Sequence, residues 1–148
     1  MNTKTENHAP GIPNRRDWGS LDDHDVNYAF ALFGGKSLEE AMPCFIEHPI
    51  ERAGELRVVP WEIFSYYIIY FVDFLTSDES KGESDCASCF LRLILEKART
   101  EPQNFKELYA RLKSAIDTVT GRQSFYRADP EIYGQFLDIK KQIRATLA

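Results

Sequence analysis

The residues in this chain that are best suited to chemistry are three cysteines and a nearby histidine. Cys44 precedes His48 by four residues, and Cys86 precedes Cys89 by three. Three thiolates and an imidazole are ligands that zinc prefers. A free cysteine also packs as a small buried apolar side chain, and Cys86 and Cys89 share a predicted helix face with Phe90. We therefore expect no cofactor, and zinc held by Cys44, His48, Cys86 and Cys89 is the alternative.

Cys44 and His48 also stand at a spacing that lets a nucleophile and a base share one helix face. Pro49 argues against this arrangement, because the residue before a proline is pushed out of the helical region. The sequence offers no evident third residue to orient the histidine and no cofactor fingerprint. It therefore favours a protein that is not an enzyme.

Acidic side chains are concentrated in the first part of the chain. Residues 17–85 hold 15 acidic and 4 basic side chains, a net charge of −11, whereas residues 86–148 hold 7 acidic and 11 basic, a net charge of +4. Residues 1–16 add +2, which gives the total of −5. Such a surface attracts and steers a basic partner. The residues that we expect to bind this partner are Asp22, Asp23, Asp25, Glu39, Glu40, Glu47, Glu51 and Glu55, with Trp61 as an aromatic anchor.

This charge pattern favours a protein-binding module that docks a basic protein by an acidic helical face. The partner is either another protein or a second copy of this chain, because the acidic and basic parts complement each other. In size, acidity and helical content the chain is similar in type to immunity proteins, which cover basic nucleases with carboxylates. That likeness is of composition only, and no residue is carried over from it. The alternative function is a helical domain of unknown role that binds a small ligand or zinc.

The sequence does not favour nucleic acid as a partner. Lys140, Lys141 and Arg144 gather near the end of the last predicted helix, where cations complement the helix dipole. The net charge of −5 and the lack of a recognised nucleic-acid motif also argue against nucleic-acid binding.

The elements that would position these residues are helices. Ser37 and Glu40 form a capping box in sequence, and Asp129 before Pro130 is typical of a helix start. Apolar residues at helical spacing predict helices over about 21–33, 37–45, 49–57, 60–76, 86–99, 104–120 and 130–147. We predict an all-α, single-domain bundle of five to seven helices at 20–148, preceded by a flexible tail at 1–19.

The segment at about 60–76 is the most aromatic part of the chain. Trp61, Phe64, Ile68 and Phe71 share one helix face. Its aromatic and β-branched residues also suit a strand, but a pattern of about 15 residues favours a helix. We expect this helix to be buried at the centre of the bundle, and its tyrosine hydroxyls offer an alternative pocket for a small ligand.

The sequence also predicts a cytoplasmic protein that does not enter a membrane. Residues 61–75 contain 12 apolar residues of 15, counting tyrosine, which is short of the roughly 20 that span a bilayer. The first 20 residues lack the apolar core of a signal peptide. Three cysteines without a disulfide-like spacing are typical of a reducing compartment.

Overall fold

The computed structural model describes residues 11–148, and every regular element among them is helical. Seven α-helices have ten residues or more, so the predicted all-α bundle of five to seven helices is confirmed. The elements in chain order are η1 (Arg15–Trp18), α2 (His24–Phe33), α3 (Leu38–Glu47), α4 (Pro49–Val58), α5 (Trp61–Leu75), η2 (Asp78–Ser80), α6 (Ser84–Thr100), α7 (Pro102–Gly121), η3 (Gln123–Tyr126), α8 (Pro130–Tyr133) and α9 (Phe136–Ala145). Among the helices of the described residues, none offers the length of apolar surface that a membrane crossing needs.

Polar side chains fix where α2 and α3 begin. The Ser37 hydroxyl accepts the amide of Glu40 at 3.1 Å, and the Glu40 carboxylate accepts the amide of Ser37 at 2.9 Å. The predicted capping box of α3 is therefore formed. The helix predicted from residue 21 begins instead at His24, because the Asp23 carboxylate accepts two amides of the next turn.

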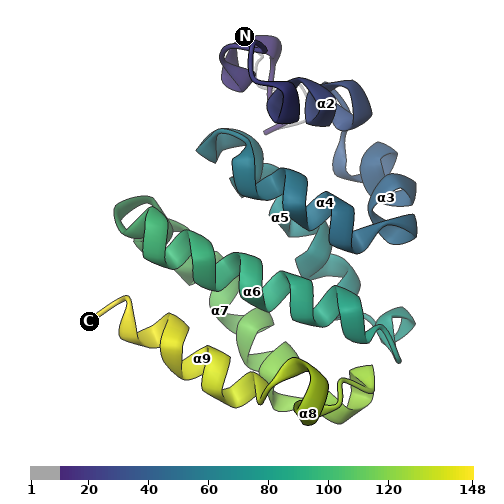
Figure 1. Ribbon diagram of the computed structural model, residues 1–148, viewed down its shortest axis with the longest axis vertical. Helices are drawn as coiled ribbons and strands as arrows, with labels where there is room; N and C mark the ends of the chain where they lie inside the picture. The colour runs from purple at the N-terminus through teal and green to yellow at the C-terminus, as the bar shows by residue number, and fades with distance from the viewer. Residues whose placement is uncertain (1–10) are drawn as a thin grey trace, which may run out of the picture. The chain divides into compact units, whose positions relative to one another are not determined.

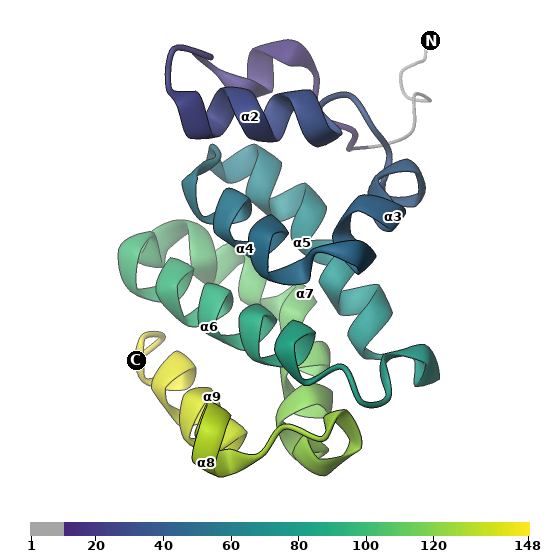
Figure 2. The ribbon, with the colours of Figure 1, turned by 45° about the vertical axis from the view of Figure 1, so that its right-hand side comes forward.

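The described chain forms two compact units. Unit 1 ends at Tyr70 and unit 2 begins at Phe71, so the boundary falls inside α5. Within unit 1, α2 packs on α4, and α3 contacts both of them (Figures 1 and 2). Within unit 2, α6, α7 and α9 pack against one another (Figure 2). The expectation of a single domain over 20–148 stays a prediction.

Aromatic side chains form the core of unit 1. The buried ring of Phe33 lies 5.3 Å from that of Phe45 and 4.8 Å from that of Tyr67, between ring centroids. The Tyr67 hydroxyl donates toward the carbonyl oxygens of Phe33 and Lys36, at 2.8 and 2.6 Å. The aromatic segment is thus a helix, α5, as predicted, and its Tyr67 hydroxyl bonds the carbonyl groups at and just after the end of α2.

Part of the segment that we expected to be a tail is folded. Asn14 and Asp17 form a capping box for η1, and the Trp18 side chain is buried against Phe30 and Phe33. Burial of a large aromatic ring stabilises a fold by about 2 kcal/mol or more, which accounts for the order of this segment. The rest of the expected tail, residues 1–10, lies outside the described residues.

In unit 2, the last carbonyl group of α5 has three donors. The Leu75 carbonyl oxygen accepts from Arg122 Nη2 at 2.5 Å, from Tyr126 Oη at 2.6 Å and from Ser80 Oγ at 3.2 Å. The Arg122 guanidinium also lies over the Phe125 ring, 4.0 Å from its centroid. A cation at this position complements the negative end of the helix dipole.

The helix predicted over 130–147 is broken into α8 and α9. Gly134 separates them with φ 79° and ψ 172°, a conformation that essentially only glycine adopts. The Gln123 carboxamide compensates the break: its nitrogen donates to the carbonyls of Ala128 and Gly134, and its oxygen accepts the amide of Phe136. The break is tolerated because the Gln123 side chain bonds the Gly134 carbonyl and the Phe136 amide, which lie at the break between the two helices.

Candidate functional site

A groove in unit 1 lies between α2 and α4, which can be followed together in Figure 1. Its volume is about 410 Å³. The lining residues are Asp25, Tyr28, Glu51, Gly54, Glu55, Arg57 and Val58. All of them belong to two regular helices, so the groove is positioned by secondary structure and not by loops.

Helical spacing brings these side chains to one opening. Asp25 and Tyr28 are three residues apart on α2, and Glu51, Gly54 and Val58 recur at intervals of three and four on α4. Residues at these intervals share a helix face. Tyr28 is 57% exposed and Val58 is 42% exposed, so the groove joins apolar surface to carboxylates.

Glu55 forms an ion pair with a buried arginine, Arg52. Arg52 is 5% exposed, and its Nη2 donates to the Glu55 carboxylate at 2.8 Å, while its Nη1 donates to the sulfur of Cys44 at 3.0 Å. Burial raises the pKa of the Glu55 carboxyl and the charge of Glu51 adds to this, whereas Arg52 opposes it. Burial acts to lower the pKa of Arg52, but its bonds to Glu55 and Cys44 outweigh burial, so that pKa is raised.

The other two carboxylates of the groove are not compensated in this way. Across residues 11–148, neither Asp25 nor Glu51 has an ion-pair partner. Both side chains are exposed, on opposite walls. The groove therefore presents two carboxylates without an ion-pair partner that a cation from outside can contact, although its lining also contains the cation of Arg57.

Three of the residues predicted to bind a partner, Asp25, Glu51 and Glu55, line the groove. The remaining acids are exposed on unit 1 outside its lining: Asp22, Asp23, Glu39, Glu40 and Glu47. Asp23 and Glu40 are used as helix caps. Trp61 is half-buried at the start of α5, with its ring 5.1 Å from that of Phe64, and it is not part of the lining.

The two units differ in charge less sharply than the sequence segments do. Residues 1–70 hold 11 acidic and 6 basic side chains, a net charge of −5, and residues 71–148 hold 12 of each, a net charge of zero. Five acids counted in the −11 segment belong to unit 2: Asp73, Asp78, Glu79, Glu83 and Asp85. The whole net charge of the chain therefore lies on the unit that contains the groove.

The residues considered for zinc do not form a metal site in the part of the chain that the structure describes. No three His, Cys, Asp or Glu side chains there are placed to hold an ion. Cys44 accepts a hydrogen bond from Arg52, and His48 is an exposed residue between α3 and α4. Cys86 is buried, and burial is the main cause that raises the pKa of its thiol, with the neighbouring Cys89 adding to it.

The tyrosines considered for a ligand pocket serve the core of unit 1. Tyr66 Oη accepts the amide of Leu38 at 3.2 Å, and Tyr67 bonds the end of α2 as described above. Tyr70 is buried. These contacts favour the interpretation that aromatic residues at this spacing are packing residues.

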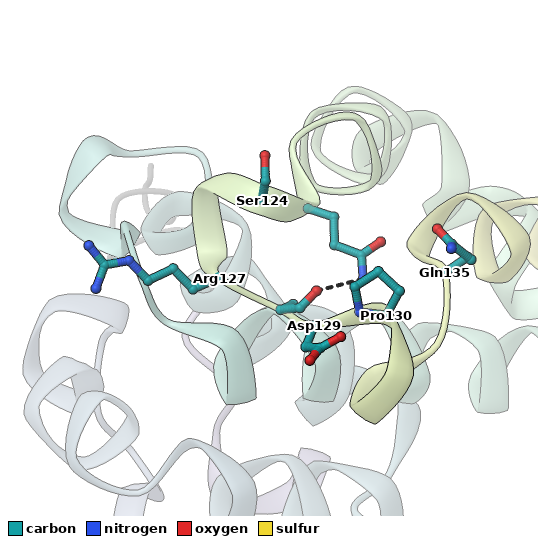
Figure 3. Close-up of a pocket in the computed structure, with 7 residues that line it drawn as sticks. Ser124, Arg127, Asp129, Pro130 and Gln135 are labelled. Atoms are coloured by element: carbon teal, nitrogen blue, oxygen red, sulfur yellow. Dashed lines mark hydrogen bonds between the residues drawn. The ribbon is translucent and has the colours of Figure 1, made fainter.

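A second cavity, of about 470 Å³, lies in unit 2 beside η3 and α8 (Figure 3). Two of its polar side chains make bonds within the unit: Gln123 braces the α8–α9 corner, and Asp129 accepts the amide of Glu131. Figure 3 shows the Arg127 side chain extending away from Asp129. The acidic groove is the better candidate for a partner-binding site, because it contains three of the acids predicted to bind a partner and an exposed aromatic ring.

Sequence reasoning did not single out Tyr28, Gly54 or Val58. Tyr28 offers a signal in retrospect, because it is a large aromatic residue off the buried face that α2 forms with Val26, Ala29 and Phe33. Gly54 offers another, because it stands inside a helical segment. Neither signal shows which element lies opposite, so the groove itself needs the tertiary structure.

Comparison of the chain with models of known protein families, with curated proteins and with solved structures finds no match. The groove offers carboxylates, an exposed phenol ring and apolar surface.

Proposed function

We propose that this protein is a non-enzymatic binding module whose unit 1 docks a basic protein partner in the groove between α2 and α4. The observation that carries the proposal is the meeting of Asp25 and Glu51, from different helices, beside the exposed ring of Tyr28. Carboxylates without internal partners attract cationic side chains. An exposed aromatic residue beside them supplies the contact area typical of interface anchors. This is the mode of binding that the likeness in type to immunity proteins suggests.

Magnitudes indicate what such a groove contributes. Exposed ion pairs are worth about 0.2–1 kcal/mol each, so two carboxylates alone do not give a tight complex. They speed the encounter with a basic partner and orient it, and the apolar contacts around Tyr28 and Val58 supply further affinity. Binding is therefore expected to weaken strongly as salt rises.

The proposal is tested with a fluorescein-labelled basic peptide in which lysine alternates with alanine, followed by fluorescence anisotropy. We expect saturable binding at about 20 mM NaCl that is largely lost at about 500 mM. Glu51→Gln should weaken binding about fivefold at low salt, because it removes one charge of the groove. Amide shifts in nuclear magnetic resonance spectra should be confined to α2 and α4.

Glu39→Gln is the matched control. Glu39 and Glu51 are both exposed acids in the first turn of a ten-residue helix, so either substitution weakens the same dipole interaction. Only Glu51 lines the groove. Equal losses for both variants, or binding that ignores salt, would show that the groove is not the docking site.

A further inference from the structure

The floor of the groove is open because α4 carries a glycine in its interior. Gly54 lies in the middle of α4, and a Cβ built on it would meet nothing within 4 Å. Its φ is not positive, so neither backbone conformation nor packing within residues 11–148 requires glycine there. A glycine inside a helix is unfavourable relative to alanine. It does allow another molecule to approach the helix backbone closely.

The walls around this floor are suited to a particular cation. Tyr28 presents an exposed ring, and Asp25 stands one turn before it on α2. Glu51 stands three residues before Gly54 on α4. A cation over the floor therefore has an aromatic face and two uncompensated carboxylates within the same lining. Glu55 is already neutralised by Arg52, and Arg57, the one cation of the lining, makes an interaction of its own within the chain.

Arginine fits this lining better than lysine. A guanidinium group is planar and weakly hydrated, so it stacks on an aromatic ring and bonds two carboxylates with separate N–H groups. A lysine ammonium is compact and strongly hydrated, and it gains less from the ring. The long aliphatic stem of arginine can also lie along apolar surface such as that of Val58.

We infer that the groove takes an arginine side chain of the partner, with its guanidinium group against Tyr28 and between Asp25 and Glu51, over Gly54. The inference rests on the proposed function and specifies which basic residue enters the groove. It predicts discrimination between two partners that carry equal charge.

The experiment compares the lysine–alanine peptide with a peptide of the same length and charge in which every lysine is arginine. We expect the arginine peptide to bind about tenfold more tightly to the full chain. Tyr28→Leu keeps a large apolar side chain but removes the ring, so it should abolish most of that preference and leave binding of the lysine peptide nearly unaffected.

Gly54→Met should fill the floor of the groove and weaken binding of the arginine peptide about tenfold or more. Gly54→Ala also removes the glycine but fills little space, so it is the control that separates these two effects.

The outcomes distinguish this inference from the proposed function. If both peptides bind equally in a salt-dependent way and Tyr28→Leu changes nothing, the arginine inference is overturned and the docking proposal stands. If neither peptide binds, the proposed function itself fails. If the arginine preference is present but Gly54→Met leaves it intact, arginine is recognised elsewhere and the inference is wrong. Circular dichroism of each variant verifies the fold, and a Cβ atom at residue 54 meets nothing within 4 Å.

Discussion

At the scale of single residues, the buried Arg52–Glu55 ion pair behind the groove is the interaction whose loss should cost the most stability. Their side chains are 6% and 12% exposed, and Arg52 also bonds Cys44. Taking two charges out of water is unfavourable, so a buried pair is worth less than its short distances suggest. Removing one partner is much more damaging, because the other charge is left buried and unpaired.

We therefore expect Arg52→Met to destabilise the protein by about 3 kcal/mol, and Arg52→Met combined with Glu55→Met to recover most of that loss. Urea unfolding of the single and double variants measures both values. If the double variant were as unstable as the sum of the two single variants, packing around Arg52 and not its charge would be responsible.

The pH dependence of the Arg52→Met variant has a definite sign. The pKa of Glu55 is already raised by burial in the folded protein, and loss of Arg52 removes a group that opposes this rise. A carboxyl whose folded pKa is raised favours folding below its unfolded pKa and loses that contribution as pH rises through the folded pKa. The stability difference between wild type and Arg52→Met should therefore shrink as pH is lowered from neutral through the raised folded pKa of Glu55, and it should change little below the ordinary value of 4.5.

At the scale of elements, two glycines have opposite roles. Gly134 has φ 79° at the break between α8 and α9, whereas Gly54 has ordinary helical φ and open space around it. Gly134→Ala should destabilise the protein by about 1–3 kcal/mol, because alanine is strained in that conformation. Gly54→Ala should stabilise it by about 0.5–1 kcal/mol, because alanine is the better helix former. Thermal or urea unfolding measures both changes. If the two substitutions changed stability in the same direction, the opposite roles given to these glycines would be wrong.

These two glycines also mark what the sequence could and could not predict about the elements. Apolar periodicity located the helices from α2 to α7, and the pairing of Ser37 with Glu40 predicted the start of α3. Ile132, Phe136, Ile139 and Ile143 continued one period across Gly134, so the break was not visible. What permits the break is the side chain of Gln123, which lies 11 residues before Gly134 and belongs to a different element. Apolar periodicity depends only on residues within one helix, so it cannot predict the hydrogen bond from Gln123 to Gly134.

At the scale of the whole molecule, the boundary between the units lies where the sequence has no break. Tyr70 and Phe71, which lie on either side of the boundary, are both buried members of α5, and no glycine, proline or polar stretch separates the units there. The −11 segment of the sequence therefore combines acids of both units. The acidic character of unit 1 could be predicted from composition, but the groove could not, because it arises where α2 and α4 pack together.

A helix shared by both units predicts that they unfold together. Breaking α5 at the boundary exposes apolar residues such as Phe71 and Ile68, which are fully buried. Both tryptophans, Trp18 and Trp61, lie in unit 1, so tryptophan fluorescence reports unit 1 alone, whereas far-ultraviolet circular dichroism reports both units. We expect the two urea transitions to coincide. A fluorescence transition that clearly precedes the dichroism transition would mean that unit 1 unfolds independently.

The brace formed by Gln123 has a consequence for the order of folding events. Its three hydrogen bonds span 5, 11 and 13 residues, so the corner between η3 and α9 closes only short loops. Loops of about ten residues close within about 10–100 ns. The Leu75 carbonyl also accepts from the nearby Ser80, but its two other donors, Arg122 and Tyr126, lie 47 and 51 residues further along the chain. We therefore expect the corner to form before Arg122 and Tyr126 reach the end of α5, because contacts between residues close in sequence form faster.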